Sequence, residues 1–402
     1  MAREVGTRVD QAWSLKTAMR RLWTDHVVWT RMYIISAVAG APMSEHLTAL
    51  LDGLVGKIAT PLGGVVSLLS NGDAAAVRLL RNQEDIGKAV VPFYGEAAGS
   101  RLTDLLKQHI LSAVDLVSAA RSGDERKFQQ EDAKWTRNAE EIAGLLSEAN
   151  PNWPKNDVVD LLGQHLDLTK RETSARIKGD WSTDIEMFDQ ILTEILTLSA
   201  VLSDGLIKQF PDRFTDGSGM SKQASSLRES MSRLWTDHVI WTRQYIVSAV
   251  ASAPDAERAA ARLLKNQDDI GAAVGSIYGD AAGKRLTELL KQHITIAVEI
   301  IDAAKKNDNA RFEQSNANWD RNAEEIAGLL SSANPNWPKA DVTDLLMQHL
   351  NLTRNELTAH MHHKHQADVD AFDQILTEIL TVSDVLATGI VKQFPDRFQS
   401  AA

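Results

Sequence analysis

The sequence predicts an all-α protein, a tandem duplication of a six-helix up-and-down bundle. Apolar residues recur at three- and four-residue spacing, as at Leu102, Leu105, Leu106, Ile110 and Leu116, which is typical of one face of an amphipathic helix. No stretch alternates clearly between apolar and polar residues with a period of two, so the sequence predicts no sheet.

Long internal repeats predict the duplication. Residues 22–31 read LWTDHVVWTR and return at 234–243 as LWTDHVIWTR, and the hexapeptide QFPDRF ends both copies. We expect the first copy at 1–214 and the second at 227–402. The first copy carries 28 extra residues, at about 43–70.

The segment 215–226 joins the copies. It reads TDGSGMSKQASS, and such Gly- and Ser-rich composition predicts a flexible linker. A natural duplication and an engineered fusion joint, with Met220 as the start codon of a second protein, explain it equally well.

A shorter repeat lies inside each copy. DLLKQHI at 104–110 resembles DLLGQHL 56 residues later, and a unit of this length with one central turn is a helical hairpin. Three antiparallel hairpins per copy make an up-and-down bundle. In the first copy we expect helices at about 13–40, 73–92, 96–121, 125–148, 155–176 and 182–210.

The composition excludes several classes of protein. The chain has no cysteine, which excludes disulfides and thiolate metal sites, and its net charge of −11 argues against binding to nucleic acid. No run of about 20 apolar residues predicts a transmembrane segment, and the first 25 residues lack the apolar core of a secretory signal. We therefore expect a soluble, cytoplasmic protein.

Polar residues interrupt the apolar stripes at corresponding places in each hairpin. The first helices carry histidines and the second helices carry an amide or an acid. In the first copy these residues are His26, His109 and His165 with Asn82, Asn138 and Asp189, and in the second His238, His293 and His349 with Asn266, Asn322 and Asp373. Burying each polar group costs about 2–7 kcal/mol unless it is hydrogen-bonded or bound to a metal.

Two arrangements would give these buried polar groups the partners they need. In the first, each histidine bonds the Asn or Asp of its own hairpin and fixes the helix register. In the second, the three histidines of a copy converge and bind zinc, iron or manganese, Asp189 or Asp373 completes the set, and Tyr33 and Tyr245 act as further polar partners.

We also predict the location or role of three other features of the sequence. The insertion at 43–70 is too interrupted to span a membrane and predicts a protein-partner or self-association surface. Four histidines between His360 and His365 are expected on an exposed loop with incidental metal affinity. Arg31 could bind a carboxylate or phosphate, but we expect it on the helix surface, solvated or paired. The apolar residues of the predicted surface are Leu47, Leu50, Leu51, Leu54, Val55, Val65, Val66, Leu68 and Leu69.

The predicted functions belong to three classes. The first is a non-catalytic binding protein that holds a divalent metal or small ligand among the buried histidines. The second is a structural or assembly protein, whose polar pairs fix register and whose 43–70 segment makes contacts. The third, a metal-dependent enzyme, would need an open coordination position and a nearby acid or base such as Asp189 or Tyr33, and it is disfavoured because no second catalytic group stands out in the sequence.

Overall fold

A computed structural model describes residues 11–41, 70–214 and 221–398, and all of its regular structure there is helical. The chain divides into two compact units, Met1–Ser218 and Gly219–Ala402. The all-α class predicted from the sequence is confirmed.

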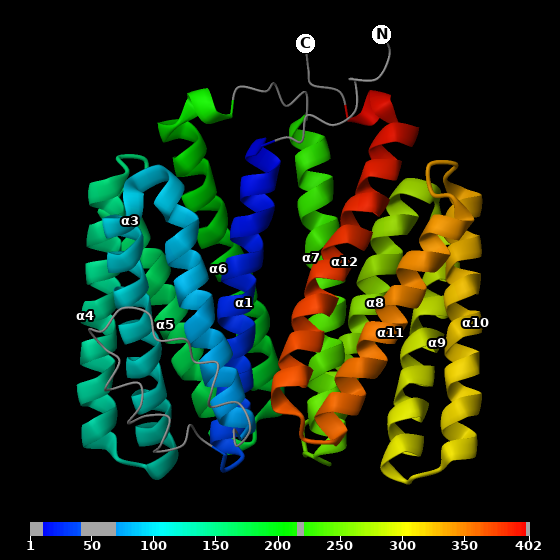
Figure 1. Ribbon diagram of the computed structural model, residues 1–402, viewed down its shortest axis with the longest axis horizontal. Helices are drawn as coiled ribbons and strands as arrows, with labels where there is room; N and C mark the ends of the chain where they lie inside the picture. Colours follow the sequence, from blue (N-terminus) through cyan, green and yellow to red (C-terminus); the bar gives the residue numbers. More distant parts are fainter. Residues whose placement is uncertain (1–10, 42–69, 215–220, 399–402) are drawn as a thin grey trace. The chain divides into compact units, whose positions relative to one another are not determined.

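Unit 1 is an antiparallel bundle whose first and last helices pack together. Each helix contacts the next, and α6 returns to α1, so the helices follow one another around a closed ring (Figure 1). Its helices are α1 (Gln11–Val38), α3 (Asn71–Ser122), α4 (Glu125–Ala149), α5 (Lys155–Lys178) and α6 (Trp181–Gln209).

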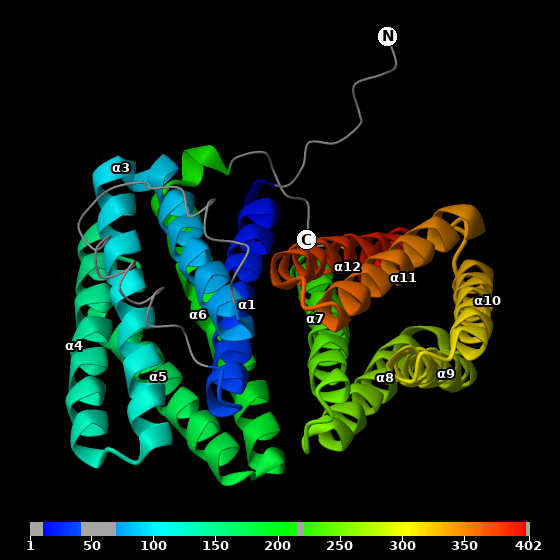
Figure 2. The same ribbon diagram turned by 60° about the horizontal axis from the view of Figure 1, so that its bottom comes forward.

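Unit 2 has the same order of contacts, with α12 returning to α7 (Figure 2). Its helices are α7 (Lys222–Val250), α8 (Ala256–Tyr278), α9 (Asp280–Lys305), α10 (Asn309–Ala333), α11 (Lys339–Met361) and α12 (His365–Gln393). Short 3₁₀ helices, η3 (Pro211–Arg213) and η4 (Pro395–Arg397), follow α6 and α12.

The helix break expected near residue 95 is present in both units. The sequence predicts separate helices at 73–92 and 96–121, and α3 consists of two helices joined at a kink at Gly95, whose φ is +82°. Unit 2 has two helices there, and Gly279 between them has a φ of +93°. Both glycines adopt a backbone conformation that other residues rarely accept, which explains glycine at each junction.

Local signals in the sequence define the other helix ends. Ser70 and Asp73 form a capping box at the start of α3, because each side chain accepts a hydrogen bond from the other residue's backbone N–H. Gly123 and Gly179 end α3 and α5 in the left-handed conformation, with φ of +71° at both. The hairpin turns therefore lie where the sequence predicts them.

A polar network ties the helices together at the opposite end of unit 1. Tyr94 on α3 donates a hydrogen bond to Gln209 on α6 at 2.6 Å, and Asn150 after α4 donates to the Tyr94 hydroxyl at 3.0 Å. Tyr278, Gln393 and Asn334 make the corresponding bonds in unit 2. Both ends of each bundle are thus fixed, and the histidines lie between them.

Helices α6 and α12 are long and apolar enough to cross a membrane by length and composition, with a mean hydropathy of 1.4 over their most apolar window. Just over half of that window, 56%, is buried inside the structure. Phe188, Leu192 and Leu198 on α6 are fully buried, which is typical of a core helix.

Candidate metal centre

The structure brings the three predicted histidines of each unit together. In unit 1, His26 on α1, His109 on α3 and His165 on α5 have ring centroids 5.5–6.2 Å apart and are at most 3% exposed. Each ring offers one nitrogen, and these nitrogens all lie within 4.8 Å of one another. We call this group triad 1.

Triad 2 has the same arrangement in unit 2. His238, His293 and His349 come from α7, α9 and α11, and their ring centroids are 5.5–6.3 Å apart. Their ligand nitrogens also lie within 4.8 Å of one another, and all three side chains are buried.

Asn138 is the partner of His109, as the sequence predicts. The Asn138 Oδ1 lies 3.0 Å from the His109 Nδ1, and the Asn138 amide donates to the Leu105 carbonyl at 3.0 Å. That second bond fixes the amide orientation, so the oxygen faces the ring and the Nδ1 carries the proton. The Nε2 of His109 therefore keeps its lone pair, and Asn322 holds His293 in the same way.

The prediction that Asp189 is the partner of His165 is wrong, because the residue that contacts His165 lies five positions later. Glu194 lies against His165, with 3.3 Å between its Oε2 and the Nδ1, and Glu378 lies 3.0 Å from His349. Asp189 and Asp373 are half-buried and belong to neither triad. Glu194 lies five residues further along α6, about 1.4 turns, and so belongs to the buried face, which Asp189 only borders.

The prediction that Asn82 is the partner of His26 is wrong, because the residue that contacts His26 is the next one along the chain. Gln83 contacts His26, and in unit 2 the Gln267 Nε2 lies 3.3 Å from the His238 Nδ1. Asn82 contacts Gln83 instead, because its Oδ1 accepts a hydrogen bond from the Gln83 amide at 3.0 Å. Asn266 does the same for Gln267.

A constant spacing links each histidine to its true partner. The separation is 29 residues for His109, His238, His293 and His349. A search of the sequence for a polar residue 29 positions after each histidine would have found every partner except that of His26, where the insertion intervenes.

Burial keeps His26, His109 and His293 neutral. Burial, together with a smaller effect of a neighbouring triad histidine, lowers the pKa of His109 and of His293 to about 3. Burial and then the two other rings hold the pKa of His26 well below its usual value. A neutral imidazole is the form that binds a metal.

The spacing fits a metal with a small inward movement. Tetrahedral zinc with Zn–N distances of about 2.0–2.1 Å places its nitrogens about 3.4 Å apart. Rings whose nitrogens lie within 4.8 Å would each have to move inward by less than about 1 Å.

Apart from the 3.3 Å contact between its Oε2 and the His165 Nδ1, the carboxylate of Glu194 has no hydrogen-bond partner, and its side chain is 2% exposed. Burying such a charge is costly unless something compensates it. A cation bound by the opposite nitrogen of His165 would do so, in the carboxylate–histidine–metal arrangement common in metalloproteins.

A buried ion-pair cluster lies beside each triad, and Arg31 belongs to it: the arginine is paired with carboxylates, but the expectation that it lies on the helix surface is wrong. Arg31 is 1% exposed and bonds Glu172 at 2.5 Å and Asp184 at 2.8 Å, while Arg176 bonds Asp184 at 3.0 Å. Burial raises the pKa of Glu172 to about 7, against the opposing effect of Arg31. Sequence reasoning missed this cluster because its carboxylates lie far along the chain.

In unit 2 a histidine takes part in the corresponding cluster. Arg243 bonds Glu356 and Asp368 at 2.6 and 2.8 Å, and the His360 Nδ1 lies 3.0 Å from Asp368. The expectation that His360 is exposed is therefore wrong, whereas His362 and His363 are exposed.

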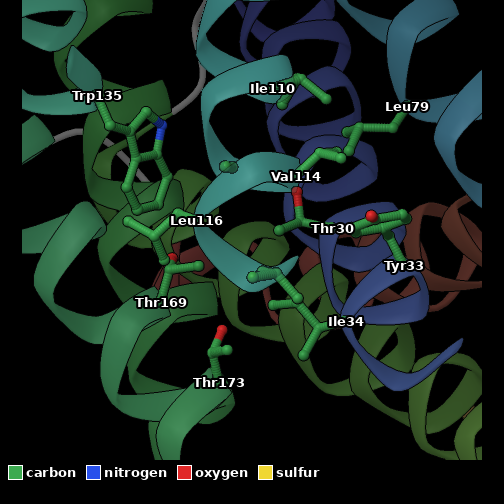
Figure 3. Close-up of a pocket in the computed structure, with 12 residues that line it drawn as sticks. Thr30, Tyr33, Ile34, Leu79, Ile110, Val114, Leu116, Trp135, Thr169 and Thr173 are labelled. Carbon is green, nitrogen blue, oxygen red and sulfur yellow. The ribbon is translucent and has the colours of Figure 1, made fainter. Parts of the chain in front are cut away.

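A small pocket lies one to two turns from each triad. Thr30, Thr169 and Trp135 line it in unit 1, together with the predicted polar partner Tyr33 (Figure 3). Tyr245 lines the corresponding pocket in unit 2, and burial raises its pKa. The cavity volume is about 10 Å³ in unit 1 and 20 Å³ in unit 2. Both tyrosines therefore belong to the pocket next to the triad.

The predicted interaction surface at 43–70 falls outside the described residues, apart from Ser70 at its end.

Comparisons with protein-family models, with curated proteins and with solved structures found no match for this chain. Its function is therefore argued from the two triads alone.

Proposed function

We propose that each unit binds one divalent first-row metal ion, zinc, iron or manganese, through its histidine triad, and that the chain is a tandem metal-binding protein of two related six-helix bundles. His26, His109 and His165 hold the first ion, and His238, His293 and His349 hold the second.

The observation that carries this proposal is the buried carboxylate behind one imidazole of each triad. Glu194 and Glu378 have at least one oxygen without a partner, although both side chains are 2% exposed. A histidine–amide pair that only fixed register would not need this charge. One carboxylate and three neutral imidazoles would leave a divalent ion with a net charge of +1.

The first test is elemental analysis of tag-free protein purified without metal-affinity resin. We expect about two equivalents of one metal per chain, and loss of both in the double variant His109→Gln, His293→Gln. The matched control His362→Gln, His363→Gln changes exposed histidines and should keep both equivalents.

A second variant keeps the proposal testable if the first fails to fold. Glu194→Gln with Glu378→Gln preserves shape and removes the charge, and we expect a loss of about 10–100-fold in metal affinity. Titration with Zn²⁺, Fe²⁺ or Mn²⁺ alone, with circular dichroism as the folding control, measures it. A folded native chain that takes up none of these ions would overturn the proposal and leave the histidines as register-fixing pairs.

A further inference from the structure

The two sides of each triad differ in side-chain size. Three residues before the histidines, on one side, stand Trp23, Leu106 and Leu162, all buried. Four residues after them, on the other side, stand Thr30, Ala113 and Thr169, which line the pocket. Residues one turn apart on a helix lie on the same face, so the large side chains close one side of the triad and the small ones leave room on the other.

Unit 2 repeats this asymmetry. Trp235, Leu290 and Leu346 precede its histidines and are buried, whereas Thr242, Ala297 and Thr353 follow them and line its pocket. The Trp235 ring packs edge-on against His238, with 6.0 Å between centroids.

The threonine hydroxyls have their hydrogens engaged and their lone pairs free to accept. Thr30 donates to the carbonyl of His26 at 2.7 Å, and Thr169 donates to the carbonyl of His165 at 2.9 Å. Each oxygen can then accept from a ligand that carries an O–H or N–H group. Thr173, one turn further on, is 1% exposed and lines the same pocket, and its hydroxyl has no partner. Figure 3 shows the three threonines around this pocket.

The dimensions fit a single water-sized ligand. A metal–oxygen bond of about 2 Å followed by a hydrogen bond of about 2.8 Å spans about 5 Å, close to the 5.4 Å rise of one helical turn. A water molecule needs about 10–15 Å³ of such a cavity, which the volumes of 10 and 20 Å³ match.

We propose that the metal in each triad has an exchangeable fourth ligand, a water molecule or hydroxide, in the pocket on the threonine side, and that no fourth protein side chain completes the site. This inference rests on the proposed metal binding. The acceptor oxygens of Thr30 and Thr169 select a small hydrogen-bond donor over an anion without hydrogen.

The test uses the full chain loaded with Co²⁺, with X-ray absorption for the coordination number and solvent-water relaxation for exchange. We expect four ligands per ion, one of them exchangeable water. Filling the pocket with Ala113→Leu and Ala297→Leu should abolish the exchangeable ligand while two equivalents of Co²⁺ remain bound.

A second pair of variants, which hardly changes the side-chain volume, tests the inference if the pocket-filling variants do not fold. Thr169→Val with Thr353→Val removes the acceptor oxygens at nearly constant volume, and water exchange should accelerate at least several-fold. The control Thr193→Val with Thr377→Val removes hydroxyls that also bond a helix carbonyl but on the exposed surface, and should change nothing.

The outcomes separate the two proposals. A chain that binds Co²⁺ in the triads without exchangeable water overturns this inference and leaves metal binding intact. A folded chain that binds no Co²⁺ overturns both. Pocket-filling variants that bind two ions and keep the water also overturn this inference, because the ligand would then lie elsewhere.

Discussion

The two units match at their histidine triads and differ at their ion-pair clusters. Both triads have the same three types of partner, namely glutamine, asparagine and glutamate. In the clusters, Arg176 of unit 1 is matched by His360 of unit 2. The partners of the triad histidines are therefore the same in both units, whereas the cluster holds an arginine in one unit and a histidine at the same place in the other.

The largest effect should come from removing the central arginine of a cluster. Arg31→Met leaves Glu172 and Asp184 buried with less positive charge, so we expect a loss of about 3–5 kcal/mol in the free energy of unfolding. Arg243→Met should cost as much or more at pH 8, because the remaining partner of Asp368 is His360.

Urea denaturation of the full chain measures both losses. Arg171→Met is the control, because that side chain is 53% exposed and should change stability by less than about 0.5 kcal/mol. A loss below about 1 kcal/mol for Arg31→Met would contradict a central role for the arginine.

The next effect concerns the feature that the units share, and it requires the metal-free chain. The pKa of His109 and His293 is lowered to about 3 when folded, whereas an unfolded histidine titrates near 6.5. Between these values the unfolded chain binds protons that the folded chain does not, so the free energy of unfolding falls as the pH falls. From pH 6.5 to 5 each histidine contributes a loss of about 2 kcal/mol.

The measurement is the change in stability between pH 7 and pH 5 with and without His109→Gln and His293→Gln. Glu172 and Glu356, whose raised pKa acts in the opposite direction, contribute equally to both chains, so the difference isolates the histidines. Equal pH profiles for the two chains would show that these rings accept protons in the folded state.

A smaller effect, on metal affinity, should follow from replacing the glutamine that contacts the first histidine of each triad. The Gln83 amide nitrogen donates both of its hydrogens, to the Leu79 carbonyl and to the Asn82 Oδ1, and in unit 2 the Gln267 Nε2 makes the same two bonds and lies 3.3 Å from the His238 Nδ1. Glutamate can only accept there and would hold the proton on the histidine Nδ1, leaving the Nε2 lone pair for a metal.

We therefore expect Gln83→Glu with Gln267→Glu to raise metal affinity by about 10-fold, the lower end of the range for partners of metal ligands. Competitive titration of Zn²⁺ against a chelator measures this change. Gln190→Glu, at an exposed position on α6, is the control. Unchanged or weaker affinity in the double variant would contradict this role for the glutamine.

The sequence predicts the histidines well and their partners less well, for physical reasons. A histidine in an apolar stripe is conspicuous because most of its neighbours at three- and four-residue spacing are apolar. Asn82 and Gln83 are adjacent polar residues, and both are buried because they hydrogen-bond each other, which the stripe does not reveal. Asp189 and Glu194 are about 1.4 turns apart on α6, and Asp189 borders the buried face that holds Glu194, so the choice between them depends on the packing of α6 against α5.

The ion-pair clusters could not be predicted because they join residues that are distant in the sequence. Arg31 bonds carboxylates 141 and 153 positions away, and nothing local in α1 marks it as buried. The helices and turns, in contrast, follow from caps and glycines within a few residues, so their bounds agree closely with the expected ones.

The smallest effect tests the difference between the units directly. An arginine carries a permanent charge and a rigid set of donors, which an imidazole does not match. His360→Arg should therefore stabilise unit 2 by about 1 kcal/mol, and Arg176→His should destabilise unit 1 by a similar amount. Differential scanning calorimetry resolves the change.

The exposed substitution His362→Arg is the matched control for that exchange, since it adds the same charge two residues away on the surface. If it reproduced the effect of His360→Arg, the gain in stability would arise from net charge and not from the buried bond to Asp368. If the two reciprocal substitutions changed stability in the same direction, the clusters would differ in packing rather than in charge. A change of opposite sign in the two units is the result that only the identity of the residue beside Asp184 and Asp368 explains.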